Sequence, residues 1–130
     1  IEVCVDSVAA AQAAQAGGAH RLELCSALSE GGLTPSLGLC AAVMRAVSLP
    51  VHVMIRSRGG DFCYSDEEMD VMLMDLAALR SLGVAGAVFG CLTPEGEVDW
   101  VRWQAFESAC TGAHVTFHRA IDMSRDPVAV

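Results

Sequence analysis

The sequence lacks the features of secreted, membrane-spanning and zinc-binding proteins. No charged segment followed by an apolar one opens the chain, and no apolar run reaches the roughly 18 residues that a membrane span needs. CxxC and CxxH pairs are also missing, which argues against a zinc module. We therefore predict a cytoplasmic protein, with presence in the nucleus also allowed and with no membrane partner.

Basic residues and aromatic residues are both scarce. Lys and Arg total 8 against 16 Asp and Glu, which gives a formal net charge of −8. An acidic chain repels phosphate backbones, so nucleic acid is a poor partner, although a local basic pocket can still bind a small anion. Aromatics make up 5% of the residues and hydrophobic residues 53%. This composition excludes disorder and suits a layered α/β protein better than a β-sandwich.

Six cysteines are present, scattered one per predicted segment: Cys4, Cys25, Cys40, Cys63, Cys91 and Cys110. Thiols in a cytoplasmic protein stay reduced. We therefore expect free thiols and no disulfide framework.

Apolar runs of strand length alternate along the chain with longer helical stretches. The predicted strands are 2–6, 21–25, 51–55, 85–89 and 114–118. Capping signals place the helix starts at Ser7, Thr34 with Pro35, Ser65 with Glu68, Asp99, and Asp126 with Pro127. The first three helices are predicted to end near Gly17, Ser48 and Gly83. Such an alternation requires parallel strands joined by right-handed crossovers.

Two α/β architectures fit this pattern. Units of about 30 residues would give roughly 250 residues over eight repeats, the usual size of a (β/α)8 TIM-type barrel. A flavodoxin-like doubly wound sheet needs only five strands.

The parity of the side chains, that is, which of the two faces of a strand each one occupies, favours the barrel. Polar or sulfur-containing residues recur at every second position in four of the predicted strands: Glu2, Cys4 and Asp6; Arg21, Glu23 and Cys25; His52, Met54 and Arg56; Thr116 and His118. Alternate residues of a strand share one face. Both faces of a doubly wound sheet lie beneath helices and should be apolar, whereas one face of a barrel sheet converges on the axis. We therefore predict a TIM-type barrel.

Only about four and a half of the eight βα units of such a barrel fit into this length. We expect residues 1–130 to be the N-terminal part of a single barrel domain whose C-terminal half is absent, with both chain ends being cuts. A half barrel leaves two unpaired edges and an uncovered inner face. We therefore expect these residues alone to aggregate or to form swapped homo-oligomers.

The C-terminal ends of barrel strands build active sites, and here they carry several charged groups. Arg56 and Arg58, beside Gly59 and Gly60, can place guanidinium and backbone N–H groups around a phosphate or carboxylate. Asp61 and Arg119 follow in the same region as further substrate-binding candidates. The structural alternative is a loop that needs glycine dihedrals and forms its own salt bridges.

Glu23 and His118 are the candidate acid–base residues. A charge inside a strand is costly unless it is paired, so Glu23 is either a member of an ion pair with Arg56 or a functional group in a polar pocket. His118 ends a strand and is either a proton shuttle or a satisfied structural histidine.

Cys4 and Cys25 lie on adjacent predicted strands with the same parity. Two thiolates within reach of each other suit a soft ion such as Cu(I), and Met54 can add a thioether. The alternative is that both behave as small buried hydrophobes.

Several long motifs resemble those of the CutC copper homeostasis family: EVCVDS (2–7), GGAHRLELCS (17–26), EGGLTPSLG (30–38), IRSRGGDFCYSDEE (55–68) and VTFHRAIDM (115–123). The resemblance implies a (β/α) barrel about twice this length, a role in cytoplasmic copper handling, and copper ligands at Cys4 and Cys25. The chain departs from the family at Ser57, where proline is usual, at His20 and at Ile121. We expect Ser57 to loosen the arginine loop.

Two functions therefore stand at this point. One is a non-enzymatic protein that binds Cu(I) through Cys4 and Cys25. The other is a barrel enzyme that acts on a small anionic substrate, with Glu23 and His118 as acid–base groups and Arg56 and Arg58 as an anion clamp. One pocket could hold both a metal and a substrate.

Overall fold

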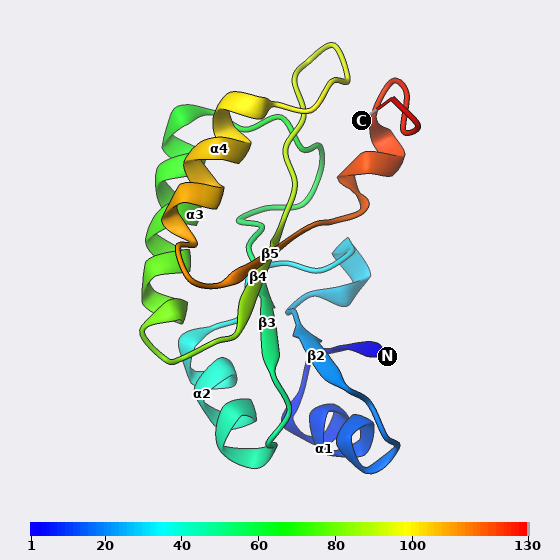
Figure 1. The fold of residues 1–130 in the computed structure, drawn as a ribbon, viewed down its shortest axis with the longest axis vertical. Coiled ribbons are helices and arrows are strands. Elements are labelled where there is room, and N and C mark those ends of the chain that lie inside the picture. Colours follow the sequence, from blue (N-terminus) through cyan, green and yellow to red (C-terminus); the bar gives the residue numbers. More distant parts are fainter. Residues whose placement is uncertain (130) are drawn as a thin grey trace.

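The computed structural model describes residues 1–129, which form a five-stranded parallel sheet with strands in chain order (Figure 1). The strands are β1 (Glu2–Val5), β2 (Arg21–Leu24), β3 (Val51–Met54), β4 (Gly86–Phe89) and β5 (His114–Phe117). A flavodoxin-like sheet reverses direction at a switch point, which gives the order 2-1-3-4-5. The order β1-β2-β3-β4-β5 is that of a barrel wall, so the predicted fold class is confirmed.

Four α-helices alternate with these strands in the described part of the chain: α1 (Val8–Ala16), α2 (Leu37–Ala46), α3 (Asp66–Arg80) and α4 (Trp100–Ala109). Successive helices contact one another, and Figure 1 shows α2, α3 and α4 on the same side of the sheet. Two short 3-10 helices, Leu28–Glu30 and Arg119–Met123, follow β2 and β5. None of the helices among residues 1–129 is long and apolar enough to cross a membrane.

The predicted helix caps are confirmed at three of the starts. The side chains of Ser7, Ser65 and Asp99 each accept a backbone hydrogen bond in the first turn, and Glu68 completes a capping box with Ser65. The prediction of a helix start at Thr34 is wrong, because Ser36 caps α2 instead. Where a helix is predicted from Asp126, residues 127–129 form a turn, and the rest of the prediction lies outside the described residues.

Thr34 holds the end of β3 rather than a helix. Its Oγ1 donates to the Arg56 carbonyl oxygen at 3.1 Å and accepts from the Arg56 N–H at 2.9 Å. A hydroxyl group that bonds to the backbone N–H and carbonyl of Arg56 is not available to cap a helix. The loop before α2 is thereby tied to the rim of the sheet.

The two faces of the sheet differ as the parity argument predicts. The main hydrophobic core lies between the sheet and the helices and contains the strand residues Leu22, Leu24, Val53 and Phe89, all of them 0% exposed. A separate small cluster of Cys25, Met54 and Val88 lies on the other face. The inner face therefore carries the polar and sulfur-containing groups.

Candidate functional site

Strand register arranges the inner-face side chains in layers. One layer crosses all five strands and consists of Cys4, Glu23, His52, Gly86 and His114. The next layer toward the C-terminal ends contains Cys25, Met54, Val88 and Thr116. Arg56, Gly90 and His118 continue the alternation at the rim. The candidate site is thus built from neighbouring strands at three depths.

Cys4 and Cys25 both lie next to the Glu23 carboxyl group. Cys25 Sγ donates to Glu23 Oε1 at 3.8 Å, and Cys4 stands directly opposite Glu23 in the register. Cys4 is exposed whereas Cys25 is buried, so solvent reaches the pair from the side of Cys4. The structure therefore brings together the two thiols that the sequence singles out.

Burial and the nearby carboxylate keep both thiols protonated. Desolvation, with the charge of Glu23 as the next cause, raises the pKa of Cys4 to about 11 and that of Cys25 further. Burial also raises the pKa of Glu23, while its contacts with the thiols oppose this increase. The cluster is a proton-rich site in which a ligand that needs thiolates must displace protons.

The described residues contain no group of three or more His, Cys, Asp and Glu side chains arranged to hold a metal ion. A hard or tetrahedral ion such as Zn²⁺ needs at least three such ligands. A soft ion bound by two sulfurs does not, and Met54 lies against Cys25 as a third sulfur. The donor set of this face therefore fits Cu(I) better than Zn²⁺.

Glu23 and His118 are not brought together. Glu23 shares its layer with His114, and His118 lies four residues later, just past the end of β5 and about 13 Å away along the strand direction alone. Of the two alternatives for Glu23, the ion pair with Arg56 does not form, because the Arg56 guanidinium donates only to backbone carbonyls among the described residues.

His118 is a buried, neutral residue at the rim. Its Nδ1 accepts the Ala120 N–H at 3.1 Å, so the proton resides on Nε2, which is buried and has no partner within residues 1–129. Desolvation, and next the charge of Arg56, lower the pKa of His118 to about 4. The ring packs against Phe62, with the ring centroids 5.2 Å apart.

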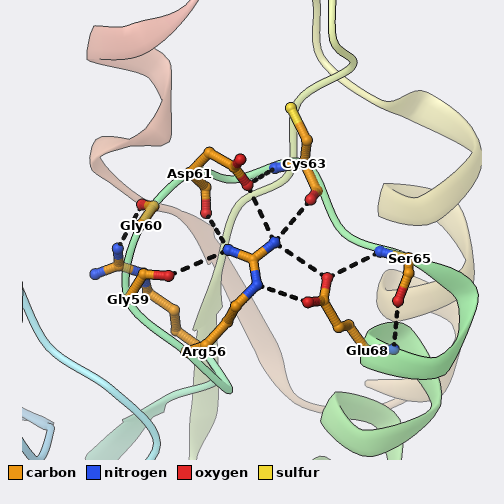
Figure 2. A network of polar contacts seen from close by, with 8 residues as sticks. Arg56, Gly59, Gly60, Asp61, Cys63, Ser65 and Glu68 are labelled. Carbon is orange, nitrogen blue, oxygen red and sulfur yellow. Dashed lines mark hydrogen bonds and ion pairs between the residues drawn. The ribbon is translucent and has the colours of Figure 1, made fainter.

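Arg58 stabilises its own loop, and its partners Asp61, Cys63 and Glu68 are labelled in Figure 2. Its guanidinium donates to the Glu68 carboxylate at 2.6 and 3.1 Å, to the Asp61 carboxylate at 3.0 Å and to the Cys63 carbonyl oxygen at 2.8 Å. The hydrogen bonds from Arg58 hold the pKa of Glu68 below its usual range. Arg58 and Asp61 therefore neutralise each other, and the structure does not present Arg58 as part of an anion clamp.

A cavity of about 640 Å³ opens at the rim, between the loops that follow β2, β3, β4 and β5. Its charged lining residues are Glu30, Arg56, Asp61 and Arg119. Of the two arginines predicted to form an anion clamp, Arg56 lines the cavity and Arg58 does not, and Arg119 is the second arginine in the lining. In the wall beside them, Gly31 belongs to the glycine pair of the EGGLTPSLG motif, whereas Phe62 carries no signal of its own in the sequence.

Gly31 has a positive φ of 86° and allows the two arginines to approach the loop. A Cβ at Gly31 would lie 2.9 Å from Arg119 Nη1 and 3.3 Å from Arg56 Nη1. Any larger residue would displace the exposed Arg119 and press on the buried Arg56. The glycine is thus needed both for backbone conformation and for space.

Comparison with known proteins places the chain in a family. The family model described as the CutC family matches residues 1–130. A CutC family protein of Mesorhizobium japonicum is 53% identical over 127 residues, which are 98% of this chain and 49% of that protein. The human protein named copper homeostasis protein cutC homolog is 52% identical over 129 residues, 99% of this chain and 47% of its own length. The chain thus spans about half the length of these relatives.

A solved structure agrees with this assignment. The crystal structure of CutC from Streptococcus agalactiae superposes with a TM-score of 0.89 at 31% sequence identity, and the match covers 95% of this chain and 60% of that one. The inner-face thiols, the barrel-type strand order and these similarities agree with one another. The chain belongs to the CutC family.

Proposed function

We propose that this copper homeostasis family member binds Cu(I) in the cytoplasm through the thiols of Cys4 and Cys25. The observation that carries the proposal is the convergence of both thiols on Glu23, from adjacent strands of the inner face. Thiolate and thioether ligands select Cu(I), and Met54 packs beside Cys25. The reducing cytoplasm would keep the two thiols from forming a disulfide.

Glu23 gives the pair a route for the protons that binding releases. Both thiols are protonated at neutral pH, and Cu(I) is bound by thiolates, so each sulfur must lose a proton. The Glu23 carboxylate accepts a hydrogen bond from Cys25 and lies opposite Cys4. It is therefore placed to take up a proton from either sulfur and pass it to solvent past the exposed Cys4.

Anaerobic titration of the purified full chain with Cu(I), against a coloured competing chelator, tests the proposal. We expect Cys4→Ser and Cys25→Ser each to weaken binding about a hundredfold or more, because a hydroxyl is a poor ligand for a soft ion. Cys63→Ser is the matched control, since this partly exposed thiol lies in the loop after β3, away from Glu23. Equal affinities for the wild type and the Cys4→Ser, Cys25→Ser double variant would refute the proposal.

A further inference from the structure

The rim cavity contains a buried positive charge that no acid among residues 1–129 neutralises. Arg56 is 5% exposed, yet its guanidinium donates only to the carbonyl oxygens of Glu30, Gly32 and Gly60, at 2.6, 3.4 and 3.0 Å. Its Nε is buried without a partner within residues 1–129. Buried charges in proteins are normally paired with an opposite charge. Arg56 therefore lacks a counter-ion in the part of the chain that the structure describes.

A second guanidinium lies beside it. The Nη1 atoms of Arg56 and Arg119 both lie close to the point where a Cβ on Gly31 would stand, so they are at most about 6 Å apart, where like charges repel. Arg119 is exposed and forms no ion pair with any residue in the described part of the chain. Two unneutralised cations facing one cavity form a site for an oxyanion.

The acidic groups of the cavity leave this position open. The Asp61 carboxylate already accepts hydrogen bonds from Arg58 and from the Cys63 N–H. The Glu30 carboxylate lies against Gly59, with Oε2 2.7 Å from where a Cβ of that glycine would stand. An oxyanion would therefore bind on the Gly31 side of the cavity, between the two arginines and away from Glu30.

Part of the cavity wall is apolar. Phe62 packs its ring over the Arg56 guanidinium at 4.9 Å, and Leu92, Pro94 and Met123 extend the wall. A volume of about 640 Å³ lies within the range of small-molecule sites. Inorganic phosphate alone would leave most of this space and the apolar wall unused.

We propose that the cavity binds a small organic oxyanion, a phosphate monoester or a carboxylate with an apolar body, through Arg56 and Arg119. The oxyanion neutralises the two guanidinium groups, and the apolar body packs against Phe62 and its neighbours. The site lies at the rim, above the layers of Cys4 and Cys25, and the proposal does not depend on copper binding.

Calorimetric titration of the copper-free full chain at low salt tests the proposal with three probes: phenyl phosphate, benzoate and inorganic phosphate. We expect saturable binding of phenyl phosphate or benzoate, and whichever binds tighter identifies the head group. Inorganic phosphate should bind at least about tenfold more weakly than phenyl phosphate, because it gains no apolar contact. We expect Arg119→Met to weaken the better probe about tenfold or more.

Arg45→Met serves as the matched control, because Arg45 is an exposed arginine near the end of α2. It should leave binding unchanged. Since the buried Arg56 supports its loop, Arg56→Lys is the milder second variant, and it should weaken binding while the chain stays folded. The proposal is overturned if no probe saturates at 10 mM or less, a limit on the order of that for very weak ligands, or if Arg119→Met and Arg45→Met bind alike.

Discussion

At the scale of single residues, His118 shows how burial fixes a protonation state. The ring is 8% exposed, lies near the cationic Arg56, and accepts a backbone N–H through Nδ1. A second proton on this ring would break the hydrogen bond and place two positive charges together. The folded chain therefore holds His118 neutral where an unfolded chain would protonate it.

Stability should consequently fall in acid. The pKa of His118 drops from 6.5 to about 4 on folding, so the unfolded state binds more protons between these values and the free energy of unfolding decreases as the pH falls through them. The loss should approach about 3 kcal/mol at pH 4. Urea unfolding at pH 7, 5.5 and 4 measures it.

His118→Asn should flatten this pH dependence, because asparagine can still accept the Ala120 N–H and does not titrate. His20→Asn, a change at an exposed histidine, is the control and should keep the wild-type slope. If His118→Asn and the wild type lose the same stability between pH 7 and 4, burial of this imidazole does not govern the acid response.

The sequence distinguishes some residues of the site well and others poorly. Parity identified the inner-face positions of Cys4, Glu23 and Cys25, since a strand repeats every two residues whatever surrounds it. It could not choose between Arg58 and Arg119 as the partner of Arg56. That choice depends on how the loop after β3 folds. Glu68 was predicted only as part of a helix cap, because its bonds to Arg58 join residues ten positions apart in the sequence.

At the scale of elements, glycines in and just after β4 leave space for the histidine rings of neighbouring strands. A Cβ at Gly86 would lie 2.6 Å from His52 Nδ1 and 2.7 Å from the His114 carbonyl oxygen. One at Gly90, just after the strand, would lie 2.6 Å from the His118 ring. The rings of His52 and His114 stack across the missing side chain, 6.1 Å apart. The two glycines therefore determine how closely the inner-face rings approach one another.

Gly86→Ala should destabilise the chain by about 1–3 kcal/mol, because the added methyl group meets the backbone of β5 and cannot be relieved by a rotamer change. Gly38→Ala is the matched control. Gly38 lies in the first turn of α2, where a Cβ meets nothing closer than 4.0 Å, and alanine is the better helix former. Thermal unfolding of both variants should show opposite shifts in Tm, and equal shifts would contradict the steric argument.

At the scale of the whole molecule, the sheet is open. Within residues 1–129, β1 and β5 are its edges, and each pairs with a neighbour on one side only. The inner face of β1 carries Glu2 and Cys4 as exposed residues. Parallel strand order and layered side chains were predictable from the sequence, because both follow from local period and connection length.

Residues 1–130 on their own should therefore self-associate. An unpaired strand edge is a template for pairing with another chain, and the partly uncovered inner face adds to the attraction. Light scattering coupled to gel filtration should show dimers or larger species whose population rises with concentration. A monodisperse monomer that unfolds cooperatively would contradict this expectation.

The bonds made by Arg58 have a consequence for how this protein can diverge. The loop they fix also presents the Gly60 carbonyl to Arg56, and Glu68, which receives two of them, belongs to the outer helix α3. The position of the Arg56 guanidinium at the rim thus depends on a contact with helix α3, on the outer side of the barrel wall. Mutational drift at Arg58 and at Glu68 should be coupled, so that homologues keep both or replace both, even though neither side chain faces the cavity.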